Sequence, residues 1–250
     1  MSGLGAEIRT GSGTPIVLLH GFGSSNQTWL PIIEKLIGRP IVAYDLPGHA
    51  GSLQYPNAGS PGTAAKAIIA DLNERGIEKA HIAGHSMGGA IATLIALMNP
   101  GLVASLTLLS PGGYGEQINA PLLRRYASAV QAEDIADCLK SMSGPDAAID
   151  PSVAEEMARM RQAQGQIEML EKIVGIIARD GKQGVIPADG IAGINVPVAV
   201  LWGTHDTVLP VEQMASMPSG WKKISIERAG HMLVDEVPEA VTNRLLALAQ

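Results

Sequence analysis

The 250-residue sequence is poor in several residue types: it has one cysteine, one phenylalanine and only 17% charged residues. The single cysteine, Cys138, excludes a disulfide within the chain, which suits a reducing compartment such as the cytoplasm. The first residues show neither the basic segment nor the apolar core of a secretory signal. No apolar run approaches the roughly 20 residues of a membrane-spanning helix. We therefore expect a cytoplasmic protein without a membrane partner.

The charge balance excludes a second class of partner. The formal net charge is −6, and lysine and arginine form no run anywhere in the chain. A nucleic-acid-binding surface needs clustered basic side chains, so no nucleic-acid partner is expected. Hydrophobic residues make up 46% of the sequence, enough for a sizeable core in one large domain with room for an inserted subdomain.

Strand-like and helix-like segments alternate through the first 110 residues. A short edge strand is expected near residues 6–10. A continuous aliphatic run, typical of a strand buried on both faces of a parallel sheet, follows at 16–19, and further strands are expected at 41–44, 79–83 and 105–109. Helical patterns lie between them at 27–37, 63–75 and 89–97. The alternation resumes with strands at 198–202 and 223–227, separated by a helix near 211–217, and a last helix at 238–248. This order predicts an α/β fold with a mostly parallel sheet and helices on both faces.

Residues 111–194 interrupt the alternation with mostly helical patterns. Asp150 and Pro151 are a suitable N-cap and first-turn pair for one of these helices. The segment 167–179 is apolar on more than one side, so we expect part of it to face a cavity. Ordinary crossovers would need strands here, and none is evident. We interpret the section as a helical cap subdomain inserted into an α/β core that comprises residues 1–110 and 195–250.

A Gly-His-Ser-Met-Gly stretch at residues 84–88 lies between a strand pattern and a helix pattern. Ser86 then occupies a sharp strand-to-helix turn, where side chains at positions 84 and 88 would collide with their neighbours. The free N–H groups at the start of the helix favour negative charge beside the serine. In this setting the motif indicates a nucleophile elbow, whereas a serine in an ordinary turn is the alternative.

A serine hydroxyl needs a base to take its proton, and the base needs a carboxylate to orient it. Functional groups gather at the carboxyl ends of parallel strands. Asp206 and His231 follow the predicted strands at 198–202 and 223–227, so we predict Ser86, Asp206 and His231 as the catalytic residues. The alternative for Asp206 is a turn or cap residue.

Two backbone N–H groups are expected to stabilise the negative charge that develops on the substrate oxygen. That of Met87 follows the nucleophile, and that of Phe22 lies in a glycine-flanked loop after the first buried strand. The histidines at other strand ends are expected to serve loop hydrogen bonding or line the edge of the site: His20, His49 and His205. His81 and His85 have an even spacing on one strand, but no third ligand accompanies them, so neither a metal nor a cofactor is expected.

Three further motifs accompany the elbow motif: His-Gly-Phe-Gly at 20–23, Asp-Leu-Pro-Gly-His at 45–49 and Trp-Gly-Thr-His-Asp at 202–206. With these motifs the chain resembles the α/β-hydrolase fold superfamily over essentially its whole length. Residues 108–115 and 229–232 are similar to the hydrolase-like domain of acetoin dehydrogenase acyltransferase components. We expect no lipoyl domain, so lipoyl-linked transfer is not carried over. The short N-terminal segment predicts about seven strands rather than the eight usual in the superfamily.

The resemblance implies acyl-ester chemistry on a small-molecule substrate: Ser86 attacks, His231 relays the proton, Asp206 orients His231, and water resolves the acyl-enzyme. We predict a serine hydrolase of small or medium acyl esters. The alternatives are a carbon–carbon bond hydrolase of dicarbonyl compounds, a thioesterase or acyltransferase, and a catalytically silent binding module. Four methionines in the cap suggest an adaptable pocket, although packing of the cap is the preferred interpretation for at least half of them: Met142, Met157, Met160 and Met169.

Overall fold

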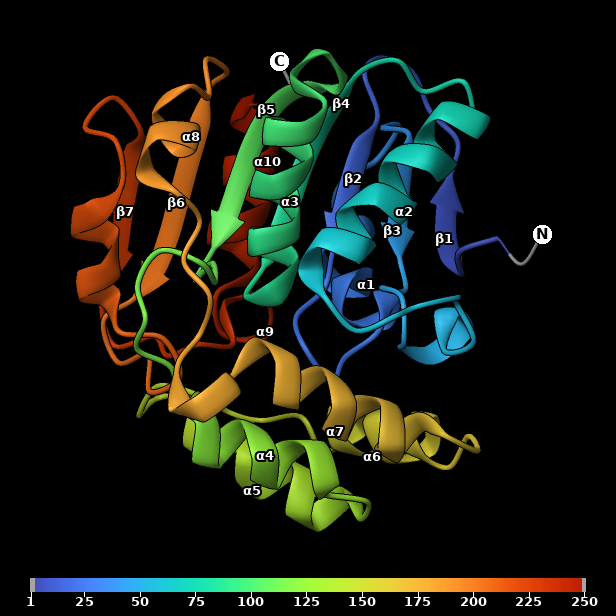
Figure 1. The fold of residues 1–250 in the computed structure, drawn as a ribbon, viewed down its shortest axis with the longest axis vertical. Coiled ribbons are helices and arrows are strands. Elements are labelled where there is room, and N and C mark those ends of the chain that lie inside the picture. The colour runs from blue at the N-terminus through green and yellow to red at the C-terminus, as the bar shows by residue number, and fades with distance from the viewer. Residues whose placement is uncertain (1–2, 249–250) are drawn as a thin grey trace.

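The computed structural model describes residues 3–248, which are built around one twisted sheet of seven strands (Figure 1). The strand order is β1-β3-β2-β4-β5-β6-β7; β1 pairs antiparallel with β3 and every other neighbouring pair is parallel. The predicted mostly parallel sheet of about seven strands is confirmed. The strands are β1 (Ala6–Arg9), β2 (Ile16–Leu19), β3 (Ile41–Tyr44), β4 (Ala80–His85), β5 (Val103–Leu109), β6 (Val198–Gly203) and β7 (Lys222–Ile226).

The aliphatic runs of the central strands reflect burial on both sides of the sheet. In β2, Val17 and Leu19 belong to one hydrophobic core, while Ile16 and Leu18 belong to a second core on the opposite face. Successive side chains of a strand point to opposite faces, so a strand covered on both sides needs an apolar residue at every position.

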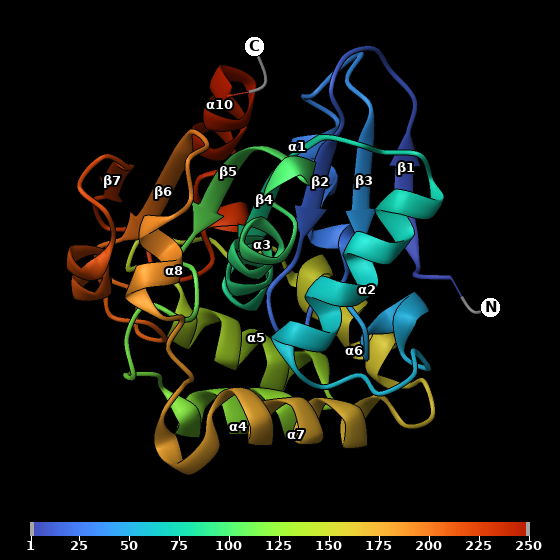
Figure 2. The same cartoon turned by 45° about the horizontal axis from the view of Figure 1, so that its top comes forward.

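Helices cover both faces of the sheet (Figures 1 and 2). On one side lie α2 (Pro61–Glu74), α3 (Met87–Met98) and α8 (Ala188–Ala192); on the other lie α1 (Leu30–Ile33) and α10 (Pro238–Leu248). Two of the predicted helices differ from expectation, because part or all of each is a 3₁₀ helix. The helix near 27–37 is a 3₁₀ turn, Asn26–Trp29, followed by α1, and the one near 211–217 is the 3₁₀ segment Val211–Ser216. Beyond α1 the backbone makes i to i+3 bonds, such as Lys35 N–H to the Ile32 carbonyl at 3.0 Å, which tighten the chain into turns.

Four helices between β5 and β6 form a layer across the carboxyl ends of the strands (Figures 1 and 2). This helical layer consists of α4 (Ala120–Ser128), α5 (Ala132–Met142), α6 (Pro151–Arg161) and α7 (Gln166–Ile177). The start of α6 is confirmed, because the Asp150 side chain accepts a hydrogen bond from the Ser152 N–H at 2.9 Å and Pro151 is the first helical residue.

A buried arginine joins two helices of this layer. Arg161, at the end of α6, donates from Nη1 to the carbonyl oxygens of Tyr126 at 2.7 Å and Ala129 at 2.6 Å. Its guanidinium carbon lies 4.3 Å from the centre of the Tyr126 ring. These carbonyls end α4, where the helix dipole favours a positive charge. Arg161 therefore fixes α6 to the connection between α4 and α5.

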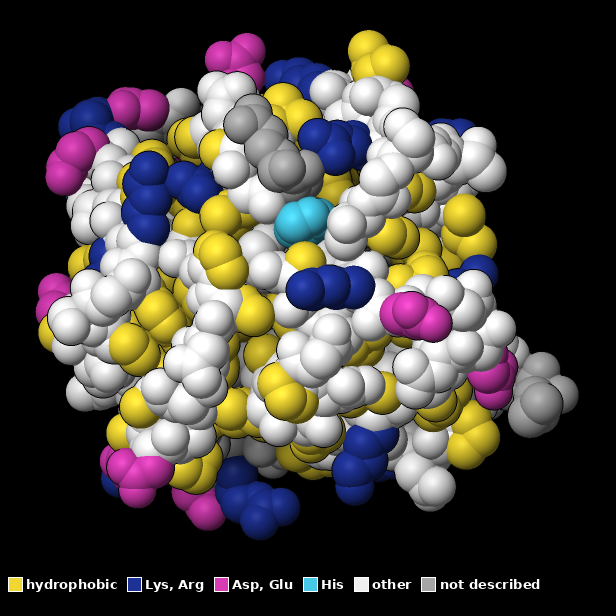
Figure 3. Space-filling model, turned by 90° about the horizontal axis from the view of Figure 1, so that it is seen from above, with side chains coloured by type: hydrophobic (Ala, Val, Ile, Leu, Met, Phe, Trp, Pro, Cys, Tyr) yellow, Lys and Arg dark blue, Asp and Glu magenta, His cyan; other side chains and the backbone are white. Residues whose placement is uncertain are grey.

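Within residues 3–248, no helix combines the length and apolar character needed to cross a bilayer. The face opposite the helical layer carries lysine, arginine and acidic side chains that are scattered among apolar and neutral groups (Figure 3). Charges of one sign do not dominate this face.

Candidate active site

The turn between β4 and α3 places Ser86 in a strained backbone conformation, with φ at 52° and ψ at −114°. A Cβ atom at Gly84 would lie 2.2 Å from the Gly88 carbonyl oxygen, and one at Gly88 would lie 2.2 Å from the Leu19 carbonyl oxygen. Only glycine fits at both positions, as the sequence predicts. The Ser86 N–H donates to the Leu109 carbonyl at 2.9 Å, which ties the turn to the neighbouring strand.

The serine, histidine and aspartate singled out in the sequence meet at the carboxyl end of the sheet. Ser86 Oγ lies 2.9 Å from His231 Nε2, and His231 Nδ1 lies 2.8 Å from Asp206 Oδ2. The side chain of His231 is 4% exposed and that of Asp206 is 0% exposed. With the proton of the imidazole on Nδ1, His231 donates to the carboxylate and accepts from the serine hydroxyl. We call this arrangement the Ser86–His231–Asp206 row.

Asp206 is held as a carboxylate by its surroundings. Burial alone would raise its pKa, but attraction by His231, the hydrogen bond from His231 and two backbone donors bring the pKa below the usual value. The backbone donors are the N–H groups of Val208, at 2.9 Å, and Leu209, at 2.8 Å, and both bind Oδ1. Oδ2 is thereby left for His231, so the carboxylate can orient the ring and stabilise its protonated form.

The two predicted amide donors, those of Phe22 and Met87, belong to residues that line a cavity together with Ser86. Neither N–H donates to another residue within the described chain. Both amides are therefore available to an oxygen atom of a bound substrate. Met87 begins α3, where the dipole adds to the attraction for a negative charge.

Two histidines hold the Phe22 loop in place, as expected from their positions at strand ends. His20 donates from Nδ1 to the Gly21 carbonyl at 2.7 Å and accepts at Nε2 from the Leu46 N–H at 2.9 Å. His49 accepts at Nε2 from the Gly23 N–H at 3.1 Å. Burial lowers the pKa of His20 to about 4 and that of His49 to about 3, so both rings are neutral and able to accept.

Comparison of the sequence with known proteins identifies the family to which the chain belongs. The sequence pattern of the alpha/beta hydrolase family matches residues 16–244. The chain belongs to the alpha/beta hydrolase family. A dihydrolipoyllysine-residue acetyltransferase component of the acetoin cleaving system from Pseudomonas putida is 32% identical over 242 residues, which cover 96% of this chain and 65% of that protein. The corresponding component of Cupriavidus necator is 29% identical and is matched over 60% of its length. The chain thus spans less than two thirds of these two relatives.

Other similar proteins bear hydrolase names. A 2-hydroxy-6-oxononadienedioate/2-hydroxy-6-oxononatrienedioate hydrolase of Cupriavidus pinatubonensis is 29% identical, over 89% of this chain and 82% of that protein. The solved structure of a meta-cleavage product hydrolase from Pseudomonas fluorescens superimposes with a TM-score of 0.84 at 19% identity, covering 99% of this chain and 94% of that one. The superposition shows that the two proteins share the fold.

Two residues that support His231 in this alpha/beta hydrolase were not identified from the sequence. His85 donates from Nε2 to the His231 carbonyl at 2.7 Å, and burial, followed by repulsion from His231, lowers the pKa of His85 to about 3. Glu236, in α9 (Leu233–Glu236), accepts from the N–H groups on either side of His231: Gly230 at 2.9 Å and Met232 at 3.0 Å. The N–H of His231 itself donates to the Met142 carbonyl at 2.7 Å.

Glu236 also accepts from the Gly144 N–H at 2.8 Å, so one carboxylate joins the His231 loop to the connection between α5 and α6. The sequence signal for His85 is its place in the elbow motif. Glu236 has no comparable signal, because its partners are backbone groups that any residue would supply. Both side chains hold the backbone of His231 and leave its ring free for Ser86 and Asp206.

We predict that Glu236→Gln lowers kcat for hydrolysis about tenfold and leaves KM nearly unchanged. The glutamine NH₂ group cannot accept a hydrogen bond, so at least one of the three amides loses its acceptor and the His231 loop is held less firmly. Steady-state kinetics below the unfolding temperature of the variant test this. Glu239→Gln is the matched control, since Glu239 is exposed on the adjacent helix. An unchanged kcat, or an equal loss in the control, would contradict the role of Glu236.

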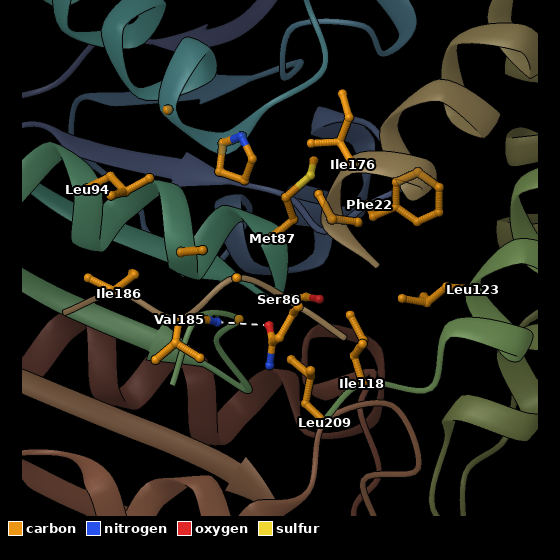
Figure 4. Close-up of a pocket in the computed structure, with 18 of the residues that line it drawn as sticks. Phe22, Ser86, Met87, Leu94, Ile118, Leu123, Ile176, Val185, Ile186 and Leu209 are labelled. Atoms are coloured by element: carbon orange, nitrogen blue, oxygen red, sulfur yellow. Dashed lines mark hydrogen bonds between the residues drawn. The ribbon is translucent and has the colours of Figure 1, made fainter. Parts of the chain in front are cut away.

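A cavity of about 360 Å³ opens beside Ser86, between the end of the sheet and the helical layer (Figure 4). Met87, Leu123 and Ile176 surround it from α3, α4 and α7. Its lining is almost entirely apolar, and no charged side chain or histidine of the described chain contributes to it. Gln183 supplies a side-chain amide, whose Oε1 is occupied by the Gly113 N–H at 2.9 Å, as drawn in Figure 4.

The lining bears out one expectation from the sequence and decides between two interpretations of another feature. The end of α7 faces the cavity through Ile176 and Ile177, as the apolar pattern of residues 167–179 predicts. The four methionines of the helical layer are absent from the lining of this cavity. Met157, for example, packs inside the layer, and its sulfur accepts a hydrogen bond from the Tyr126 hydroxyl at 3.1 Å. The packing interpretation is therefore the correct one for the large cavity, which is shaped by branched aliphatic side chains.

Proposed function

We propose that this chain is a serine hydrolase that cleaves carboxylic esters of small or medium, uncharged acyl groups through an acyl-enzyme on Ser86. The observation that carries the proposal is the Ser86–His231–Asp206 row beside two free amides. This combination supplies a nucleophile, a base, a group that orients the base and donors for the developing negative charge.

In the proposed reaction His231 takes the Ser86 proton while Oγ attacks the ester carbonyl. The N–H groups of Phe22 and Met87 receive the negative charge on the carbonyl oxygen. His231 then gives its proton to the leaving alcohol, and Asp206 stabilises the imidazolium until this transfer. Water repeats the sequence and releases the acid. We propose the helical layer as the cap that covers these steps.

The positions of the side chains favour one orientation of the substrate. His231 must reach the leaving oxygen, so the alcohol departs on the side of His231. The large cavity is lined by Ser86 but not by His231, so we assign it to the acyl group. A cavity of this size falls within the usual range for small ligands, and its apolar lining suits a hydrocarbon chain.

The absence of charge in the lining bears on the alternatives. The substrate in the name of the Cupriavidus pinatubonensis relative is a dioate, which carries two carboxylates. Burying a carboxylate without a cationic partner is costly, and the described lining provides none. We therefore favour neutral esters over anionic dicarbonyl compounds. Acyl transfer to a thiol is the second candidate, and the Pseudomonas putida relative is the observation in its favour.

A panel of acyl compounds tests the proposal, with one pair matched in size. We expect p-nitrophenyl valerate to be hydrolysed at least about 100-fold faster in kcat/KM than the p-nitrophenyl monoester of succinic acid, because only the latter buries a carboxylate. Thioesters and a 2-hydroxy-6-oxo-dienoate complete the panel. A preference for the dienoate would favour carbon–carbon cleavage. A lack of turnover together with no fluorophosphonate adduct on Ser86 would favour a silent binding module.

A further inference from the structure

We propose that a second, much smaller cavity beside His231 binds the water molecule that hydrolyses the acyl-enzyme, and that the hydroxyls of Ser24 and Thr28 hold this water. The inference rests on the proposed serine-hydrolase function and assigns a task to two residues outside the Ser86–His231–Asp206 row. It locates the second nucleophile of the reaction.

The small cavity has a volume of about 20 Å³ and shares Phe22, Ser86 and Leu123 with the lining of the large one. Unlike the large cavity, it is lined by both Ser86 and His231. A water molecule needs a cavity of at least about 10–15 Å³ by this measure, so one water fits and a thiol or amine acceptor does not. The contact with His231 matters because the attacking water must give up a proton to that ring.

Polar groups in the lining meet the second requirement for a bound water, which is two to four hydrogen-bond partners. Ser24 is only 6% exposed, yet its hydroxyl has no partner among residues 3–248, and the same holds for the hydroxyl of Thr28. Two other donors in the lining are already occupied: the Tyr126 hydroxyl donates to the Gly23 carbonyl at 3.2 Å, and His85 Nε2 donates to the His231 carbonyl at 2.7 Å. Ser24, Thr28 and His231 Nε2 together give the water three partners.

The backbone around the two hydroxyls is itself fixed. The Ser24 N–H donates to the Gly21 carbonyl at 3.4 Å, and the Thr28 N–H donates to the Ser25 carbonyl at 3.3 Å. The same loop carries the Phe22 amide, which is assigned to the substrate oxygen. One loop therefore holds both the carbonyl oxygen and the water that attacks its carbon, which fixes the angle between them.

The chemical step balances without a further reactant. The water oxygen bonds to the carbonyl carbon of acyl-Ser86 as one water proton passes to His231 Nε2. The carbon–Oγ bond then breaks, and the proton on His231 passes to Ser86 Oγ. The carboxylic acid leaves, and the serine hydroxyl is restored. Ser24 and Thr28 orient the water so that one lone pair faces the carbonyl carbon while one hydrogen faces His231.

Carbamoylation of Ser86 isolates the water step for measurement. A p-nitrophenyl N-methylcarbamate transfers its carbamoyl group to an activated serine, and the carbamoyl-serine hydrolyses slowly enough to be timed by mass spectrometry. In Ser24→Ala and in the isosteric Thr28→Val we expect decarbamoylation to slow about fivefold each, since each loses one hydrogen bond to the water. Carbamoylation itself should stay within about twofold, because nitrophenolate release needs no water.

Two further variants separate the water site from general damage to the loop. Thr28→Ser keeps the hydroxyl and should retain the wild-type rate of decarbamoylation. Ser25→Ala removes a neighbouring hydroxyl that caps the 3₁₀ turn and does not line the cavity, so it should also leave that rate unchanged. Unchanged decarbamoylation in Ser24→Ala and Thr28→Val, equal slowing of both steps, or equal slowing in Ser25→Ala would overturn the proposal. If wild-type Ser86 is not carbamoylated at all, the proposed serine-hydrolase function fails instead.

Discussion

Ser86→Ala should lower kcat for p-nitrophenyl ester hydrolysis by about 10⁶-fold, to the level set by binding and the amide donors alone. The variant keeps the cavity and both amides but has no oxygen to attack the ester. Water would have to act directly, without the covalent intermediate that divides the reaction into two easier steps. Steady-state kinetics give the loss, and a fluorophosphonate probe, followed by mass spectrometry, should mark the Ser86 peptide of the wild type only.

Ser110→Ala is a closely matched control for this experiment. Ser110 also has a positive φ, 40°, and also follows a central strand, but its buried hydroxyl makes no hydrogen bond within the described chain. Alanine imposes similar backbone strain at both sites, so both variants should unfold near the wild-type temperature. We expect the control to keep its activity within about twofold. Activity above one hundredth of wild type in Ser86→Ala, or an equal loss in both variants, would refute the role of Ser86.

The features of the site that are predictable from the sequence depend on contacts within short stretches of chain or on the general geometry of a parallel sheet. The elbow needs glycines at fixed distances from Ser86, because the close contacts arise within the turn and with the adjacent strand β2. The row is predictable because parallel strands end at the same edge, which brings the loops after β4, β6 and β7 together whatever their separation in the sequence. The cap of α6 is predictable for a similar reason, since Asp150 binds an amide two residues away.

The features that escape prediction depend on contacts between distant segments. Glu236 binds the amide of Gly144 across the boundary between the sheet and the helical layer, and no residue pattern marks a backbone amide as its partner. The lining of the large cavity is another case. Whether a methionine or an isoleucine of a helix faces the cavity depends on how α4–α7 pack against one another, and several sides of these helices are apolar. The sequence alone therefore does not decide between the pocket and the packing interpretation of the four methionines.

Asp206→Asn should reduce kcat by about 10⁴-fold although it replaces the carboxylate with a group of nearly the same shape. The backbone N–H groups of Val208 and Leu209 both point at Oδ1, so the carbonyl oxygen of the asparagine must occupy that position. Its NH₂ group then faces His231 Nδ1 and can only donate to it. The imidazole proton is driven to Nε2, where it points at Ser86, and the serine loses its base.

The pH dependence of Asp206→Asn provides an independent test of this explanation. The buried His20, His49 and His85, whose pKa values fall to about 4, 3 and 3, stay neutral from pH 5 to 8, so none of them changes charge in the range where the acid limb of the pH–activity profile is measured. Without the negative charge of Asp206 the imidazolium is less stable, so the limb of the variant should move to lower pH.

Asp235→Asn is the control, because Asp235 is a half-buried aspartate near the same loop. Burial raises the pKa of Asp235 to about 7, so near neutral pH a large fraction of this carboxyl is protonated, and asparagine closely imitates that form. We expect this variant to keep its activity within a few-fold and its acid limb in place. A loss below tenfold in Asp206→Asn, or an acid limb that stays at the wild-type pH, would mean that Asp206 serves the turn before Val208 and does not act on His231.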